Sequence, residues 1–219
     1  MGRAKAVLPF GRTTILERIL RELGPRFDQI IVVAAPAAGE PFPVDPIVQG
    51  VAGAVLVRDR NPYAGPAQAL IRGLAAATNE VAFACSCDLP LLRADFARSL
   101  CDMLGDYQAV IPEVGGRLQP LCAAYRRACG AALAAGRIAS RAAPAAARRA
   151  SRDDAAAPAA DRDDAAAASA EPSLTSLVSR LTLRIVGESE LRLLDPDLKC
   201  FFNVNTSEDY ARALSLAGL

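Results

Sequence analysis

The sequence contains no histidine and no tryptophan, and aromatic residues make up only 5% of its 219 residues. Without histidine, the chain cannot use a Ser-His-Asp or Cys-His catalytic arrangement, a histidine-ligated zinc site or a histidine pH switch. The charges nearly cancel, because 25 Lys and Arg residues are matched by 24 Asp and Glu residues. This balance argues against a duplex-DNA-binding protein, which needs a basic surplus to displace counterions from phosphates.

Long apolar runs and targeting signals are also missing. The longest apolar run near the amino terminus, residues 30–38, is too short to span a bilayer and contains Pro36. Six cysteines are present without a CxxC pair. We interpret them as free thiols that serve as small core residues in a reducing compartment. These features predict a soluble cytoplasmic protein that binds neither nucleic acid nor a membrane.

Short apolar runs alternate with amphipathic segments along most of the chain. Runs that are apolar on both faces are typical of parallel strands covered by helices. The alternation therefore predicts an α/β fold, a doubly wound, mostly parallel sheet flanked by helices with Rossmann-like topology. A loop rich in proline and glycine is expected at 36–53. The expected strands are 29–35, 54–57, 81–87, 107–111 and 183–186, and the expected helices are 13–24, 66–78, 93–104, 126–136, 173–181 and 206–216.

One stretch departs from this pattern. Of the 29 residues at 142–170, 16 are alanine and none is Val, Ile, Leu, Met or aromatic. Such a segment has no apolar stripe that could dock on a core, so we interpret it as a mobile insertion whose charges are solvated. The predicted organisation is a single domain, residues 1–219, with a low-complexity alanine-rich insertion at about 138–172.

Two acidic residues directly follow expected strands. Asp59 follows the strand at 54–57 and Asp88 follows the strand at 81–87. Because ligands of doubly wound sheets bind beyond the carboxyl ends of the strands, both residues are candidates for the site. A turn-forming role is the alternative for each of them.

Five local patterns, in this order, resemble the molybdenum cofactor guanylyltransferase family, which belongs to the broader α/β nucleotidyltransferases. None of the patterns is specific by itself, and together they extend over nearly the whole chain outside 138–172. The patterns are residues 1–11 (MGRAKAVLPFG), 65–66 (GP), 87–90 (CDLP), 116–121 (GRLQPL) and 203–210 (NVNTSEDY).

The resemblance implies a reaction in which the terminal phosphate of molybdopterin attacks the α-phosphate of GTP in the presence of Mg²⁺. Pyrophosphate leaves, and a dinucleotide form of the cofactor results. A phosphate nucleophile is already ionised near neutral pH, so the lack of histidine is compatible with this chemistry. Such a transfer needs positioning and neutralisation of developing charge.

The resemblance also implies roles for individual residues. Lys5 would contact the nucleotide phosphates, and Asp88 would ligate Mg²⁺; both are the expected catalytic residues. The implied partners are GTP, molybdopterin and proteins of molybdoenzyme maturation. The remaining nucleotide-binding candidates are Gly2, Asp59 and Gly65, and the acceptor-side candidates are Asn203, Asn205, Arg117 and Gln119.

The sequence departs from the family at two positions of the nucleotide site. Relatives have a strand and a Gly-rich loop before the element that corresponds to residues 1–5, so we expect the polypeptide to begin upstream of Met1. The first strand is central in the common strand order, and its loss exposes the hydrogen-bonding edges of two neighbours. We therefore expect the 219-residue form to be a poor enzyme. Ala69 also stands where relatives carry a second glycine.

Three alternatives remain open at this point. A cytidylyltransferase for the same cofactor shares the fold and the metal-binding aspartate. A non-catalytic cofactor-binding protein is compatible with the absent phosphate loop. A sugar-phosphate nucleotidyltransferase uses the same phosphate chemistry but is less compatible with the pattern at 203–206.

Overall fold

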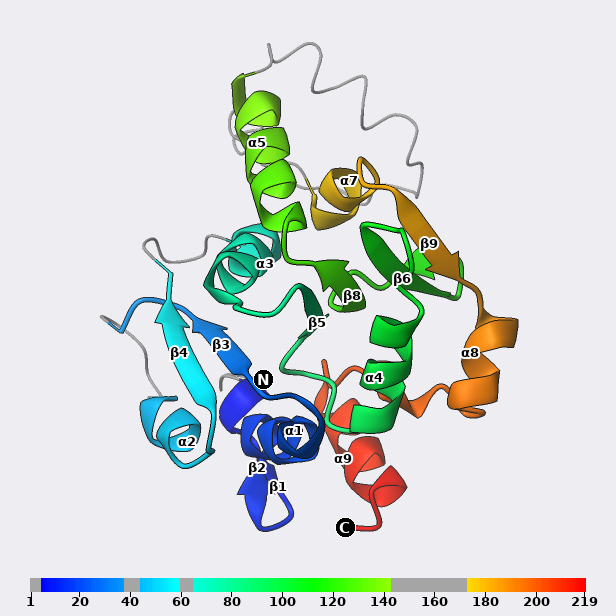
Figure 1. Ribbon diagram of the computed structural model, residues 1–219. Helices are drawn as coiled ribbons and strands as arrows, with labels where there is room; N and C mark the ends of the chain where they lie inside the picture. Colours follow the sequence, from blue (N-terminus) through cyan, green and yellow to red (C-terminus); the bar gives the residue numbers. More distant parts are fainter. Residues whose placement is uncertain (1–4, 38–43, 60–64, 143–172) are drawn as a thin grey trace, which may run out of the picture.

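The computed structural model describes residues 5–37, 44–59, 65–142 and 173–219, the side chains of 138–142 excepted (Figure 1). Gly2 and most of the predicted alanine-rich insertion lie outside the described residues. Within the described ranges, a two-stranded parallel sheet and a five-stranded sheet are flanked by helices, beside a short two-stranded hairpin, as the predicted α/β class requires. No helix in these ranges has the length and apolar character needed to cross a membrane.

The amino-terminal elements form a small unit that packs on the core. A 3-10 turn, η1 (Lys5–Val7), precedes the hairpin of β1 (Pro9–Phe10) and β2 (Thr13–Thr14). The predicted first helix is confirmed as α1 (Ile15–Leu23). Thr14 caps it by accepting a hydrogen bond from the Glu17 amide at 3.2 Å. The second 3-10 turn, η2 (Gly24–Arg26), follows directly.

The first sheet consists of two parallel strands, β3 (Ile30–Ala34) and β4 (Ala54–Arg58). The loop predicted between them contains a short helix, α2 (Asp45–Gln49), which corrects that prediction. Pro46 stands in its first turn, where the missing amide proton costs no helical hydrogen bond. Buried Val48 anchors the helix to the core.

The second sheet has five strands in which β8 (Cys122–Arg126) lies between β5 (Val81–Cys85) and β6 (Ala109–Val114). β7 (Arg117–Leu118) and β9 (Leu183–Val186) both pair with β6. Only the β6–β9 pairing is parallel, so this sheet is mixed rather than mostly parallel. Gly115 and Gly116 form the turn between β6 and β7, where positive φ angles of 58° and 70° reverse the chain and make these two strands antiparallel.

Helices cover both faces of the second sheet. One face carries α3 (Gly65–Ala76), α5 (Cys129–Ala142) and α7 (Leu174–Val178), and the other carries α4 (Ala94–Asp102) (Figure 1). The helix predicted from residue 126 begins only at Cys129, because β8 continues through Arg126. It also extends beyond the predicted end at 136.

The carboxyl-terminal part contains α8 (Glu188–Leu194), the 3-10 turn η4 (Lys199–Phe201) and α9 (Ser207–Leu216). The predicted last helix is confirmed as α9, which begins with a capping box in which Thr206 and Asp209 each accept a hydrogen bond from the other's backbone amide. α8 has no counterpart among the predicted elements.

Removal of residues 143–170, with a short Gly/Ser bridge in their place, is expected to change the melting temperature by less than about 3 °C. The neighbouring helices α5 and α7 are already in contact, and Leu133 and Leu177 belong to the same buried core. The segment 142–170 supplies no Val, Ile, Leu, Met or aromatic side chain to this core. Thermal unfolding followed by circular dichroism measures the change. A drop of 10 °C or more would show that the segment contributes to the core.

Candidate active site

The site is built around Asp88, three residues beyond the end of β5. Its side chain is 17% exposed. The backbone carbonyl of Asp88 accepts a hydrogen bond from the Val204 amide at 3.0 Å. This bond joins the end of β5 to the segment before α9, although the two are far apart in the sequence. The expectation that Asp88 lies at a strand's carboxyl end is therefore met.

Lys5 reaches Asp88 from the amino-terminal turn η1. Its ammonium group lies 3.4 Å from Asp88 Oδ2 and donates a hydrogen bond to Asn205 Oδ1 at 2.5 Å. Three of the predicted site residues, from the beginning, middle and end of the chain, therefore meet at one point. A cation, a carboxylate and an amide placed together at a sheet edge can bind phosphate oxygens and a metal ion.

Ser86 is a member of this cluster that the sequence patterns did not single out. Its hydroxyl donates to Asp88 Oδ1 at 2.5 Å, while Lys5 is the neighbour of Oδ2. The hydrogen bond from Ser86 to Oδ1 thus fixes the orientation of the Asp88 carboxylate, and Oδ2 faces Lys5 in the site. The signal available in the sequence was only the spacing of two residues, because the chain turns at Cys87 and Asp88 and the contact is made across that turn.

Asp59 occupies the predicted position at the end of β4. Its amide donates to the carbonyl of Ala34 at 2.8 Å. Its Oδ1 atom lies 3.4 Å from Nε of Arg72 on α3, and neither atom has a hydrogen-bond partner among the described residues. The side chain is 11% exposed. Arg72, which the sequence patterns did not identify, therefore positions Asp59 by charge.

The other predicted residues are distributed around the site. Gly65 begins α3 with φ +79°, a conformation that glycine adopts without strain. Asn203 and Asn205 are both exposed, one on either side of buried Val204. Arg117 and Gln119 belong to the β6–β7 hairpin region, where Gln119 Nε2 donates to the Arg117 carbonyl at 3.2 Å. Within the described residues, no hydrogen bond or ion pair joins these two to Lys5 or Asp88.

The cysteines are free thiols, as predicted, and none of the six forms a disulfide. Cys122, Cys129 and Cys200 are buried. Burial raises the pKa of the Cys85 thiol, close to the site, to about 12. A thiol that stays protonated is a poor nucleophile and a poor metal ligand, so Cys85 does not compete with Asp88 for a divalent ion.

The described residues contain no cluster of three or more His, Cys, Asp or Glu side chains able to hold a metal ion. A metal ion bound to Asp88 would therefore have one protein carboxylate and would take its other ligands from substrate and water. Mg²⁺ is commonly bound in this way, through one or two carboxylates and phosphate oxygens. The oriented, partly exposed carboxylate of Asp88 is compatible with such a site.

Comparison with known proteins gives a match over much of the chain. The family model of the MobA-like NTP transferase domain matches residues 1–157. A probable molybdenum cofactor guanylyltransferase of Carboxydothermus hydrogenoformans is 31% identical over 127 residues, which are 58% of this chain and 59% of that protein. A protein of the same description from Mycobacterium tuberculosis is 37% identical over 133 residues, 58% of this chain and 61% of that one.

The chain thus spans about three fifths of the length of these curated relatives. A solved structure, molybdopterin-guanine dinucleotide biosynthesis protein A from Archaeoglobus fulgidus, matches 99% of this chain and 92% of its own. The TM-score is 0.68 at 17% identity, so this likeness concerns the fold. From the match of the family model over residues 1–157, the chain belongs to the MobA-like NTP transferase domain family.

Proposed function

We propose that this protein is a nucleotidyltransferase of molybdenum cofactor biosynthesis that transfers GMP from GTP to the phosphate of molybdopterin. The observation that carries the proposal is the meeting of Lys5, Asp88 and Asn205 within 3.4 Å at the carboxyl end of β5. The names of the relatives support the choice of substrates.

The proposed reaction forms a bond between a phosphate oxygen of molybdopterin and the α-phosphorus of GTP. The bond from the α-phosphorus to the oxygen that leads to the β-phosphate breaks, and pyrophosphate leaves. The attacking oxygen is already ionised, so the protein's part is to align the two phosphates and to offset their charge. Lys5 supplies a compact positive charge for the triphosphate and the departing pyrophosphate.

Asp88 would hold the Mg²⁺ ion through its Oδ2 atom, while Ser86 keeps Oδ1 engaged. When bound, the ion would neutralise negative charge on the triphosphate oxygens. In the structure, Lys5 is the cation next to Asp88. Binding of a metal-nucleotide complex would let the Lys5 ammonium turn from the carboxylate to a phosphate oxygen.

Asp59 supports the choice of guanine. A carboxylate can accept hydrogen bonds from both the N1–H and the amino group of guanine, whereas cytosine offers it only the amino group. Arg72, 3.4 Å from Asp59 Oδ1, would hold the carboxylate in position for this contact. We therefore expect GTP to be a better substrate than CTP. The cytidylyltransferase alternative predicts the opposite preference.

The proposal is tested by incubating the protein with Mg²⁺, molybdopterin and α-phosphate-labelled GTP, CTP or ATP in separate reactions. The expected result is a labelled dinucleotide and pyrophosphate with GTP, with at least about tenfold less product from CTP. Product from CTP in preference to GTP would identify a cytidylyltransferase. Tight binding of molybdopterin without pyrophosphate release from any nucleotide would instead indicate a cofactor-binding protein.

A further inference from the structure

The helix α1 holds the loop that follows Asp88 at two points. Arg18 Nε donates a hydrogen bond to the Pro90 carbonyl at 2.6 Å. Pro90 is buried, so its carbonyl needs a donor from the protein, and Arg18 supplies one. One helical turn further on, Glu22 Oε1 accepts a hydrogen bond from the Ala94 amide at 2.9 Å, which gives the first amide of α4 a partner. The loop is therefore fixed on α1 near both of its ends.

The same arginine also contacts the amino-terminal hairpin. The central carbon of its guanidinium group lies 5.2 Å from the centre of the Phe10 ring in β1. Phe10 is only 2% exposed, so the cation rests on a ring that the core holds in place. Lys5 lies in the turn just before the hairpin, where its carbonyl accepts a hydrogen bond from the Leu8 amide at 3.1 Å. Arg18 thus joins the segment that carries Lys5 to the loop that follows Asp88.

A tyrosine of α9 joins the hairpin to the third segment of the site. The Tyr210 hydroxyl donates a hydrogen bond to the Pro9 carbonyl. Asn205, the partner of Lys5, is fixed on the same helix, because its amide donates to Asp209 Oδ2 at 3.0 Å. In Figure 1 the hairpin and α9 lie at the same end of the molecule. Tyr210 therefore helps to determine how closely the Asn205 segment approaches Lys5.

The remaining pair of segments is joined through the backbone. The Val204 amide donates a hydrogen bond to the Asp88 carbonyl at 3.0 Å. Each two of the three segments of the site are therefore connected, twice through a side chain and once through backbone atoms. The two side-chain connections, those of Arg18 and Tyr210, can be removed by substitution without a change in the backbone.

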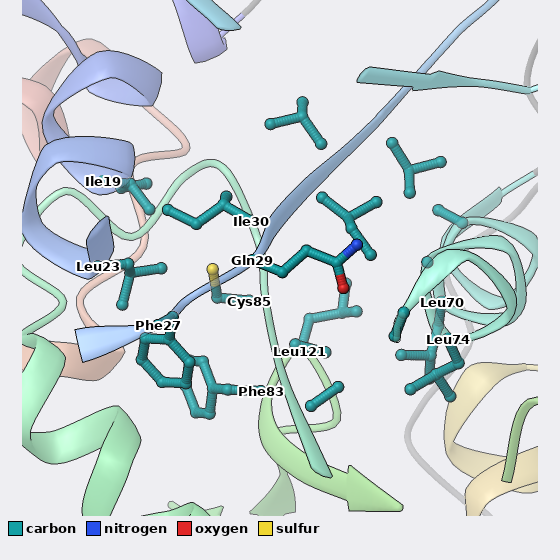
Figure 2. A pocket seen from close by; sticks show the side chains of 18 of the residues that line it. Ile19, Leu23, Phe27, Gln29, Ile30, Leu70, Leu74, Phe83, Cys85 and Leu121 are labelled. Carbon is teal, nitrogen blue, oxygen red and sulfur yellow. The ribbon is translucent and has the colours of Figure 1, made fainter. Parts of the chain in front are cut away.

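The polypeptide that leads to Asp88 is loosely packed on one side. A cavity of about 350 Å³ lies there, and residues 85–87 are among those that line it. Figure 2 shows Ile19 and Leu23 of α1 on one side of this cavity. Because packing leaves room behind this segment, the hydrogen bonds from α1 contribute more to the position of Asp88 than they would in a filled core.

We propose that Arg18 and Tyr210 are positioning residues, which hold Lys5, Asp88 and Asn205 in their relative positions from outside the site. This inference rests on the proposed function. Transfer between two phosphates requires the carboxylate and the ammonium group at a fixed separation, and a displacement of about 1 Å can cost about 100-fold in rate. Within the described residues, no hydrogen bond or ion pair joins Arg18 or Tyr210 to the three site side chains. Their effect therefore passes through the segments that they connect.

Two substitutions at Arg18 separate its hydrogen bond from its bulk. Arg18→Met removes the donor and keeps an aliphatic side chain, whereas Arg18→Gln places an amide nitrogen as many bonds from Cα as the arginine Nε. We expect kcat for transfer to fall about 10- to 100-fold in Arg18→Met, with KM for GTP within about threefold, and Arg18→Gln to recover most of the loss. Arg21→Met is the matched control, because Arg21 lies on the same helix, is 64% exposed and pairs with Glu17. An arginine with a purely structural role would leave kcat per folded molecule unchanged well below the melting temperature.

Tyr210→Phe removes a single hydroxyl group and leaves the ring in place. We expect about a 10-fold fall in kcat with little change in KM for GTP, because the groups that contact the nucleotide are all retained. Tyr107→Phe is the matched control, since Tyr107 is 41% exposed and its hydrogen bonds to Leu104 and Arg126 are made by backbone atoms.

A second measurement needs no substrate. The Val204 amide, which bonds with the Asp88 carbonyl, should exchange with solvent at least about fivefold faster in Arg18→Met and in Tyr210→Phe. Neither substitution removes that hydrogen bond, so faster exchange reports a looser connection between the segments. The Leu177 amide of α7, in the other buried core, is the reference. Exchange is followed for individual amides by NMR.

The two measurements distinguish a failure of this inference from a failure of the proposed function. Unchanged exchange at Val204, or an unchanged kcat in variants of an active protein, would overturn the positioning roles. A higher KM without a loss of kcat would place Arg18 or Tyr210 in substrate binding and also overturn them. If the original chain transferred no nucleotide while exchange at Val204 became faster in both variants, the proposed reaction would be wrong and the connection of the three segments would stand.

Discussion

Replacement of Asp88 by asparagine is expected to reduce nucleotide transfer by about 10²- to 10³-fold and to remove the metal-dependent part of GTP binding. Asparagine keeps the shape of the side chain but lacks the charge that a divalent ion requires. The fold should be retained, because the Asp88 carbonyl that bonds with the Val204 amide belongs to the backbone.

Two measurements separate the contributions of metal and fold. Titration of Mn²⁺ in the presence of GTP, followed by electron paramagnetic resonance, reports the loss of the ion, and pyrophosphate release reports the chemistry. Asp102→Asn is the matched control, since Asp102 is 62% exposed and pairs with Arg98 on α4, and no ion pair within the described part of the chain joins it to Lys5 or Asp88. If the Asp88 variant bound the metal-nucleotide complex as the original chain does, the proposed role of Asp88 would be wrong.

Ser86→Ala is a milder change at the same carboxylate. It removes the hydroxyl that donates to Asp88 Oδ1 and leaves the charge in place. We expect about a 10- to 100-fold loss of metal affinity, as for other groups that orient a ligand without touching the metal. Because the carboxylate remains, raising the metal concentration should restore transfer in this variant and not in Asp88→Asn.

The sequence was informative wherever local rules determine the structure. The helices at 13–24 and 206–216 were predicted from local patterns, and each begins with a cap between residues three positions apart. α2 was missed because Pro46 was interpreted as part of a loop, although proline is compatible with the first turn of a helix. α8 was missed because its anchoring contact, from the Gly115 amide to Glu188 Oε1 at 2.8 Å, joins distant segments.

The site shows the same division. Lys5 and Asp88 were predicted from their resemblance to a family pattern, since no local rule brings together residues 83 positions apart. Ser86 and Arg72 have no such pattern, and their roles depend on distances that only the assembled fold determines.

Lys5→Met is expected to have opposite effects on two ligands, and this makes it the sharper test of the proposed chemistry. Loss of the ammonium group should weaken the binding of Mg²⁺–GTP by about 10- to 100-fold, because charge-assisted hydrogen bonds to phosphate are lost. It should strengthen the binding of Mn²⁺ alone, because the cation that competes for Asp88 is removed. Isothermal titration calorimetry measures both affinities.

The chain offers a matched control in Lys199, its second and only other lysine, which is 43% exposed and pairs with Asp197. Lys199→Met should change neither affinity, since no hydrogen bond or ion pair of the described residues joins it to Lys5 or Asp88. A Lys5 that served only to hold the Asp88 and Asn205 segments together would behave differently. Its loss would lower the melting temperature and weaken the binding of both Mg²⁺–GTP and Mn²⁺. Loss of a phosphate-binding Lys5 would weaken the binding of Mg²⁺–GTP and strengthen the binding of Mn²⁺.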